Sequence, residues 1–280
     1  MPPRRPVNFQ EWVDAVIKYR CNKFSGTPAV IRALIKNGLA YTLGEAGCLS
    51  SVAVGAGTMS PWLCSEAQKA LRCPVMANYG LSEVGGALTR ASPVLPSTPG
   101  SVGRLAGEVQ IRIVDTFGND CEQGELLVKS PTVMKGYFNN PKATMEAVDE
   151  HGWLHTGDYA RFCDKTEELF IIDRIKELIK YKGWSIAPAE LEAVLESHDS
   201  VAEAAVVGIQ AEEGFGEMPK AFVVLKNGLC LSDTTIDELH ELIRTRCLDY
   251  KMLRGGIVQI QEMPKNASNK TLRRVLRNMT

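Results

Sequence analysis

The chain has 280 residues, of which 45% are hydrophobic and 23% are charged, and its formal net charge is −1. This composition is ordinary for a globular protein of one large or two modest domains, and the near-neutral charge argues against nucleic-acid binding, which needs a basic face. No apolar run reaches the roughly 18 residues needed to span a bilayer, so no membrane span is expected.

The first part of the chain alternates predicted helices and strands. Apolar residues at helical spacing predict an amphipathic helix over 9–20, and a second helix should follow Pro28. Short apolar strands are predicted over 50–54 and 74–79, with a helix over 61–71 between them. Because strands that alternate with helices usually lie side by side, this pattern predicts a parallel sheet.

From about Gly100 the pattern changes to strands separated by glycine-rich turns. Val109, Ile111 and Ile113 alternate with polar residues, as expected for a strand with one buried face. Further strands are predicted over 125–129 and 169–172. Together they indicate a small β-barrel-like subdomain.

The last part of the chain again mixes helices and strands. Pro188 is placed to open a helix, since proline is tolerated in a first turn. Strands are predicted over 203–208 and 220–226, and Thr235 with Glu238 predicts a capping box for another helix. We place a domain boundary at residues 173–176.

Cysteine and histidine usage gives no sign of a metal site or a disulfide framework. The eight cysteines are scattered without a Cys-x-x-Cys pair, and the four histidines lack metal-ligand spacing. We expect reduced, mostly buried thiols. The first residues carry two arginines without a following apolar segment, and the chain does not end in Ser-Lys-Leu, so a cytoplasmic location is the default expectation.

The segment 78–83 combines groups that could bind a nucleotide. The Tyr79 ring could stack on a base, the Ser82 hydroxyl could bond a phosphate, and Glu83 could hold Mg²⁺, a hard ion that prefers oxygen ligands. The plain alternative is a strand-to-loop turn with a solvated glutamate. Upstream, the small residues 55–57 would allow close approach of a ligand, although most glycine pairs merely turn.

Two further segments carry polar groups in glycine-containing turns. Asp158, at the end of the turn 152–158, could accept hydrogen bonds from both hydroxyls of a ribose, or it could simply stabilise the turn. The block 173–184 places four cations within nine residues, next to the predicted boundary. These cations could be a solvated face, but Gly183 behind them can adopt a positive φ.

Lys270 stands near the end of the chain in a predicted loop. Its ammonium could meet the charge that builds when a carboxylate attacks the α-phosphate of ATP. Two unit charges about 4 Å apart interact by roughly 4 kcal/mol at an effective dielectric near 20. The alternative is a solvent-exposed lysine beside a basic tail.

Four motifs together resemble the acyl-adenylate-forming superfamily, especially its acyl-CoA ligase, 4-coumarate–CoA ligase and luciferase-like branch. They are Tyr79-Gly80-Leu81-Ser82-Glu83, His155-Thr156-Gly157-Asp158, Asp173-Arg174-Ile175-Lys176-Glu177 and Pro264-Lys265-Asn266-Ala267-Ser268-Asn269-Lys270. The resemblance covers nearly the whole chain, but only the second half of such an enzyme. It implies an α/β fold with part of a large domain over 1–173, made of a parallel sheet with helices and a distorted β-barrel subdomain. A small, mobile α+β domain over 174–280 would follow.

The resemblance also implies roles for individual residues. Near the nucleotide it places Tyr79 against adenine, Ser82 at a phosphate and Glu83 at magnesium, with Gly55, Ala56 and Gly80 lining the site. It assigns Asp158 and Arg174 to the ribose. It places Lys270 in the adenylation step, Lys176 at a hinge that needs backbone freedom, and Lys180 with Gly183 in a loop that serves the second half-reaction.

The implied reaction uses ATP, Mg²⁺ and a small carboxylic acid to form an acyl-adenylate. Coenzyme A would then accept the acyl group, and a carrier-protein thiol is the lesser option. The family's phosphate-binding loop has no match here, since residues 24–28 only faintly resemble it, which suggests that an N-terminal half is missing. Asn269 also replaces the family glycine. A non-catalytic or decayed fragment that binds nucleotide or a partner therefore stays open as the alternative.

Overall fold

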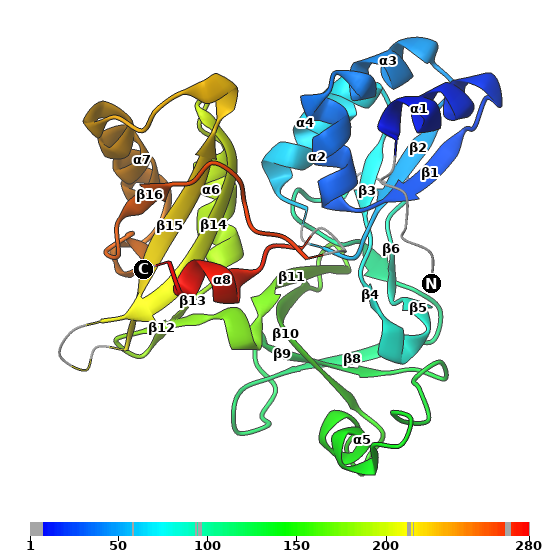
Figure 1. The fold of residues 1–280 in the computed structure, drawn as a ribbon. Helices are drawn as coiled ribbons and strands as arrows, with labels where there is room; N and C mark the ends of the chain where they lie inside the picture. The colour runs from blue at the N-terminus through cyan, green and yellow to red at the C-terminus, as the bar shows by residue number, and fades with distance from the viewer. Residues whose placement is uncertain are drawn as a thin grey trace. The chain divides into compact units, whose positions relative to one another are not determined.

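The computed structural model describes residues 8–57, 59–92, 94, 97–211, 214, 216–266 and 270–279 (Figure 1). The chain forms two compact units. The N-terminal unit comprises Met1–Thr156 and Ala160–Ile171, and the C-terminal unit comprises Gly157–Tyr159 and Ile172–Thr280. Among the described residues, no helix has both the length and the apolar character that crossing a membrane requires.

The first sheet of the N-terminal unit is parallel, as the alternating pattern predicted. Its strands lie in the order β1 (Lys23–Gly26), β2 (Ser51–Val54) and β3 (Val75–Ala77). The helices around it are α1 (Phe9–Lys18), α2 (Pro28–Lys36), α3 (Leu39–Ala46) and α4 (Pro61–Leu71). The predictions of α1, α2, α4 and both later strands are confirmed, whereas β1 and α3 had not been predicted.

A polar residue before the first turn starts three of these helices. The side chains of Asn8, Thr27 and Ser60 accept hydrogen bonds from backbone N–H groups one turn ahead. In α2 and α4 a proline then occupies the first turn, where its missing N–H costs nothing. The apolar faces of the helices meet over the sheet in one buried core, which includes Val13, Val16, Ile31, Leu34, Leu63 and Ala67.

Helix α3 depends on glycines that sequence periodicity does not reveal. It lies between Gly38 and Gly47, both of which have positive φ. Inside the helix, a Cβ on Gly44 would lie 2.2 Å from the carbonyl oxygen of Ala70. Glycine at this position therefore lets α3 pack closely against α4.

The second sheet has six strands and curls like part of a barrel (Figure 1). Their order is β6 (Thr89–Arg90), β7 (Arg104–Leu105), β11 (Glu168–Arg174), β10 (Leu154–Cys163), β9 (Gln123–Lys129) and β8 (Gln110–Val114). The sheet stays open, with β6 and β8 as its edges. A hairpin of β4 (Gly80–Leu81) and β5 (Gly86–Ala87) and the helix α5 (Pro141–Ala147) complete this part.

The carboxylate of Glu168, on β11, is buried and surrounded by hydrogen-bond donors. Only 1% of the residue is exposed, and its carboxylate accepts hydrogen bonds from the backbone N–H and hydroxyl of Thr98. Burial by itself raises the pKa of this carboxyl, but hydrogen bonds from Thr98, Thr166 and Ser101 outweigh burial and lower it. The ionised form is therefore favoured in the folded state.

We expect Glu168→Gln to destabilise the N-terminal unit by about 1–3 kcal/mol at pH 7, because the variant loses charge-assisted hydrogen bonds. The pKa of Glu168 is lower in the folded state than in the unfolded state, so the ionised carboxylate stabilises the fold at any pH above the unfolded-state pKa. This stabilisation is lost as the pH falls through the folded-state pKa. Urea unfolding between pH 7 and pH 3 should therefore show a shallower acid slope for the variant. The neighbouring, exposed Glu167→Gln is the control, and an identical slope for both variants and the wild type would contradict the prediction.

The C-terminal unit is built around a sheet that helices cover on both faces (Figure 1). Strand β15 (Glu217–Leu225) pairs antiparallel with β14 (Val201–Gln210) and parallel with β16 (Ile257–Gln259). Alternate residues of β14 point to opposite faces. Ala204 and Val206 pack with α6 (Pro188–Glu196) and α7 (Asp233–Arg246), whereas Ala205 and Val207 pack with α8 (Arg273–Arg277). A hairpin of β12 (Ile179–Tyr181) and β13 (Trp184–Ile186) precedes α6.

The structure confirms the predicted start of α6 and corrects the predicted cap of α7. The capping box of Thr235 and Glu238 is wrong, because α7 begins earlier and the Ser232 hydroxyl accepts a hydrogen bond from the N–H of Thr235. Helix α6 begins at the predicted Pro188 but has no cap from its own segment. Instead, the Asp173 carboxylate accepts a hydrogen bond from Ala189 N at 3.0 Å.

Candidate functional site

The predicted base-binding segment follows the carboxyl end of β3. Asn78 donates its N–H to Val54 O at 2.8 Å, and its side-chain oxygen accepts from Ala91 N. The next residue, Tyr79, donates its backbone N–H to the Thr89 hydroxyl at 2.9 Å. Thr89 is fully buried. The backbone that carries the Tyr79 ring is therefore fixed on both sides by hydrogen bonds.

The small-residue segment after β2 lies beside this backbone. Gly55 donates its N–H to Gly26 O at 3.0 Å, and a Cβ on Gly55 would lie 3.4 Å from Asn78 O. Ala56 follows with a φ of 61°, which is unusual for a residue with a side chain. Gly55, Ala56 and the Asn78–Tyr79 backbone thus meet at the carboxyl ends of adjacent parallel strands, the usual place for ligands in open α/β sheets.

Gly80, Ser82 and Glu83 continue along the same segment. Gly80 pairs with Ala87 in the β4–β5 hairpin, and Ser82 is exposed in the 3₁₀ turn Ser82–Val84. Glu83 is half-buried, and one of its carboxylate oxygens accepts a hydrogen bond from the Tyr137 hydroxyl at 2.8 Å. This hydrogen bond raises the pKa of Tyr137, so the phenol stays a donor.

The Glu83 carboxylate forms no ion pair with any of the described residues. Within the described part of the chain, no lysine, arginine or histidine lies within ion-pair distance of it. Nor do the described residues contain a cluster of three or more His, Cys, Asp or Glu side chains that could hold a metal ion by themselves. This carboxylate could therefore share a divalent cation with a phosphorylated ligand, which is how Mg²⁺ is commonly bound.

The two predicted ribose-binding residues lie next to each other in the C-terminal unit. Arg174 Nε is 3.1 Å from Asp158 Oδ1, and the pair joins the neighbouring strands β10 and β11. The Asp158 side chain is only 5% exposed, whereas that of Arg174 is 51% exposed. The ion pair therefore fixes the orientation of the Asp158 carboxylate.

The predicted hinge residue follows directly. Lys176 lies in the 3₁₀ turn Ile175–Glu177, and the neighbouring Glu177 carboxylate accepts a hydrogen bond from Arg277 Nη2 at 3.0 Å. Sequence reasoning did not identify this contact, because 100 residues separate its two partners.

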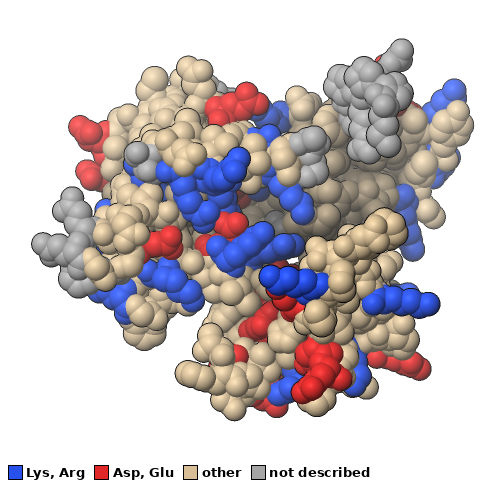
Figure 2. All heavy atoms as spheres, turned by 60° about the horizontal axis from the view of Figure 1, so that its bottom comes forward, with Lys and Arg blue, Asp and Glu red and all other residues tan. Residues whose placement is uncertain are grey.

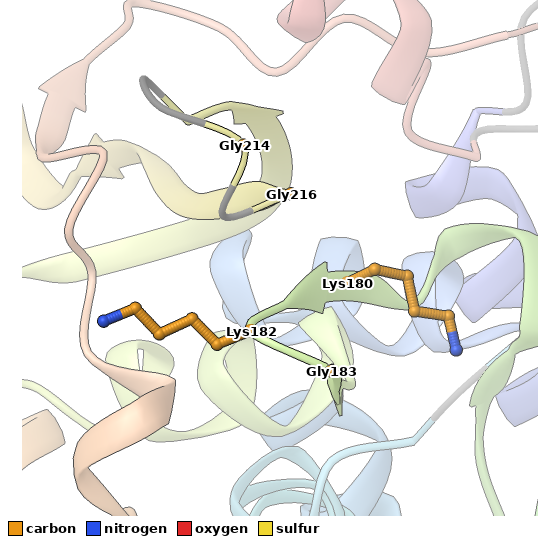
Figure 3. A pocket seen from close by; sticks show the side chains of 5 residues that line it. All are labelled: Lys180, Lys182, Gly183, Gly214 and Gly216. Atoms are coloured by element: carbon orange, nitrogen blue, oxygen red, sulfur yellow. The ribbon is translucent and has the colours of Figure 1, made fainter.

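Lys180 and Gly183 line one surface hollow, together with Lys182, Gly214 and Gly216. Its volume is about 610 Å³. Figure 3 shows the Lys180 and Lys182 side chains extending in opposite directions from the β12–β13 hairpin. The Lys180 amine donates to the Ser185 hydroxyl. A Cβ on Gly216 would lie 2.2 Å from Lys180 O, so glycine is needed where the two segments meet. Lys180, Lys182 and Gly183 are all exposed at the edge of this hollow.

Lys270 lies on the returning arm of a short hairpin. Its backbone carbonyl accepts from Asn266 N, its N–H donates to Asn266 Oδ1, and a bridge pairs Lys265 with Thr271. The side chain is exposed. Asn269, which replaces the family glycine, lies outside the described residues.

Figure 2 shows Lys and Arg side chains lying beside Asp and Glu side chains on the face that it draws. The cations that the sequence singled out lie on separate elements. Lys176, Lys180 and Lys270 belong respectively to a 3₁₀ turn, the strand β12 and a hairpin arm.

Comparison with known families gives two matches along the chain. A family described as "AMP-binding enzyme" matches residues 1–138, and one described as "AMP-binding enzyme C-terminal domain" matches residues 190–270.

Curated relatives and solved structures agree with these matches. The chain is 36% identical over 275 residues to a putative acyl-coenzyme A synthetase of Emericella nidulans, covering 97% of this chain and 48% of that protein. It is 42% identical over 207 residues to 4-coumarate–CoA ligase 1 of Glycine max, covering 71% of this chain and 69% of that one. The structure of o-succinylbenzoate coenzyme A synthetase from Bacillus subtilis in complex with AMP superimposes with a TM-score of 0.81 at 30% identity, over 96% of this chain and 53% of that chain. The chain spans about half the length of most of these proteins.

Proposed function

Because the chain belongs to the AMP-binding, adenylate-forming enzyme family, we propose that it functions as an AMP-forming acid–CoA ligase. In this reaction a carboxylic acid is activated as its acyl-adenylate, and the acyl group then passes to the thiol of coenzyme A. One observation carries the proposal. Gly55, Ala56 and the fixed Tyr79 backbone meet at the carboxyl ends of parallel strands. The exposed Ser82 hydroxyl and the Glu83 carboxylate, which has no cationic partner among the described residues, follow on the same segment.

In the first step a carboxylate oxygen attacks the α-phosphorus of ATP, and the bond to pyrophosphate breaks. The Tyr79 ring would stack on the adenine, while the Asp158 carboxylate, oriented by Arg174, would accept the ribose hydroxyls. The Lys270 ammonium would lie against the charge that develops at the α-phosphate. Such electrostatic stabilisation is commonly the largest single contribution to catalysis.

Glu83 is the residue that would hold Mg²⁺, and the ion would screen the phosphate charges when bound. The Glu83 carboxylate suits this ion, because it is half-buried and has no cationic partner among the described residues. It also lies one residue from the Ser82 hydroxyl. Tyr137 would hold this carboxylate in place through its hydroxyl.

Tyr137→Phe is expected to weaken binding of Mn²⁺ with ATP by about 3- to 10-fold, because removing one hydrogen bond to a charged group frees the Glu83 side chain to rotate. Electron paramagnetic resonance of free Mn²⁺ measures this affinity directly. Phe138→Leu, at the neighbouring and 93% exposed position, is the control. Equal Mn²⁺ affinity in Tyr137→Phe and the wild type would rule out the assigned role of the hydroxyl.

In the second step the thiol sulfur attacks the acyl carbonyl, AMP leaves with its phosphate oxygen, and the thiol proton is released. The loop from Lys180 to Gly183 would serve this step. Its hollow offers cations and backbone to the phosphates of coenzyme A. The names of the acyl-coenzyme A synthetase and the 4-coumarate–CoA ligase among the relatives support coenzyme A as the acceptor. A rotation at Lys176 would bring first Lys270 and then this loop to the adenylate.

The purified chain tests the proposal in two assays. Calorimetry with acyl-sulfamoyl adenosines, which imitate an acyl-adenylate, should show binding that Asp158→Asn weakens. Release of AMP should depend on both a carboxylic acid and coenzyme A when aryl, short-chain and fatty acids are screened. A carrier protein loaded with phosphopantetheine, offered in place of coenzyme A, tests the other acceptor.

Lys270→Ala should lower the rate of AMP formation about 100-fold or more, the usual cost of one transition-state contact, and should change the affinity for the analogue only slightly. Arg274→Ala, which removes a nearby exposed cation, should leave both unchanged. Binding of the analogue without acid-dependent AMP release would instead fit a non-catalytic nucleotide-binding chain, and absence of both would overturn the proposal entirely.

A further inference from the structure

The hairpin that carries Lys270 is fixed to the C-terminal unit at both ends. Before it, Met263 is 2% exposed, and after it, Leu276 of α8 is fully buried. Both side chains pack in one cluster with Phe222 of β15 and with residues of β14. The Lys265 amine also forms an ion pair of 2.9 Å with Glu203 of β14. The segment therefore has an apolar anchor on each side of Lys270.

Arg273, three residues after Lys270, adds a buried polar anchor. Its guanidinium donates to both carboxylate oxygens of Glu192 and to the carbonyl oxygen of Val206. The two charged side chains are only 18% and 16% exposed. Burial alone lowers the pKa of Arg273, but the Glu192 carboxylate outweighs this effect and raises it, so the guanidinium stays charged. One side chain thus joins α8 to α6 and to β14.

Arg277, one turn later on α8, reaches a different element. Its Nη2 donates to Glu177 Oε2 at 3.0 Å, and the two side chains are 36% and 22% exposed. Glu177 belongs to the same 3₁₀ turn as Lys176. A helix of five residues therefore connects the arm that bears Lys270 with the turn that bears the predicted hinge residue.

We propose that Arg273 and Arg277 are positioning residues, which hold the Lys270 arm as a fixed part of the C-terminal unit and couple it to the turn Ile175–Glu177. A lysine that acts by electrostatic contact must be placed to within about 1 Å, since displacement by that much can cost about 100-fold in rate. The coupling rests on the described contacts alone. Only its consequence for catalysis rests on the proposed function.

Hydrogen–deuterium exchange of the full chain tests the coupling through Arg277, the more exposed of the two. Arg277→Met should speed exchange about tenfold in residues 265–266, 270–272 and 175–178, the factor expected for loss of one charge-assisted hydrogen bond. Exchange in β14 and β15 should stay unchanged. Arg277→Lys should restore part of the protection, because a lysine can still pair with Glu177. Arg274→Met, on the same helix, is the matched control and should behave like the wild type.

Two results would overturn the proposal: unchanged exchange in both segments of Arg277→Met, or a uniform increase that includes β14 and β15. The catalytic consequence has a separate readout. In Arg277→Met the kcat of AMP formation should fall about tenfold while KM for the acid stays the same. A wild-type chain without AMP formation, but with the expected exchange pattern, would disprove the proposed function and leave the coupling intact.

Discussion

Replacing Arg273 with methionine is expected to lower the free energy of unfolding of the C-terminal unit by about 3–5 kcal/mol at pH 7. The change leaves the Glu192 carboxylate, 16% exposed, without the guanidinium that neutralises it. It also leaves the Val206 carbonyl without one of its donors. Unpaired buried charge is among the few causes that make a single substitution this costly.

A double-mutant cycle isolates the ion pair from the packing of the two side chains. Replacing both residues, Arg273→Met with Glu192→Met, should recover most of the loss, because an apolar pair of similar volume removes the unpaired charge. Urea unfolding of the single and double variants gives the coupling free energy. Arg244→Met breaks an exposed pair in the same unit and should cost less than about 1 kcal/mol. If Arg273→Met were no more harmful than Arg244→Met, the buried pair would not be the anchor described.

The second large effect is expected at Gly80. In Gly80→Ala the new Cβ would lie 2.1 Å from Gly86 O and 2.8 Å from Ala87 Cα, both backbone atoms of the partner strand. No side-chain rotation relieves such a contact, so the β4–β5 hairpin must open. We expect a loss of about 3 kcal/mol in the stability of the N-terminal unit. The Tyr79 and Glu83 positions on either side should also shift, with loss of adenylate-analogue binding.

The opposite strand of the same hairpin supplies the control. A Cβ on Gly86 would meet nothing within 4 Å, so Gly86→Ala should be nearly neutral. Gly80→Ala should therefore lower the unfolding temperature and weaken analogue binding, whereas Gly86→Ala, the same substitution six residues away, should change neither. Similar behaviour of the two variants would show that the close approach at Gly80 does not constrain the site.

The sequence predicted the elements whose signals are local. Helices α2 and α4 each begin with a hydroxyl residue followed by proline, and the long strands β14 and β15 are apolar on both faces because helices cover both. Elements without such signals were missed. Strand β1 has four residues, helix α8 has five, and α3 depends on the close approach of Gly44 to α4. Their formation is decided by tertiary packing, which no short window of sequence contains.

The candidate site likewise contains residues that a local motif reveals and contacts that only the tertiary fold creates. Asp158 and Arg174 stand out as motif residues, and their pairing follows from the adjacency of the strands β10 and β11. The contact between Tyr137 and Glu83 spans 54 residues, and Tyr137 follows an ordinary glycine turn that gives no sign of a partner. The residue roles of Tyr79, Ser82, Lys176, Lys180 and Lys270 stay predictions that the experiments above address.

The hydrogen bond from Ala189 N to the Asp173 carboxylate has a consequence for motion. Any swivel of the backbone at Lys176 would leave these two residues on opposite sides, so this bond has to break each time. Burial has already raised the pKa of Asp173, which means that the carboxylate gives up hydration in its present position. Breaking the hydrogen bond would cost roughly 1 kcal/mol, the usual net value of one such bond. If the backbone turns at Lys176 as proposed, this single hydrogen bond would have to break with each rotation.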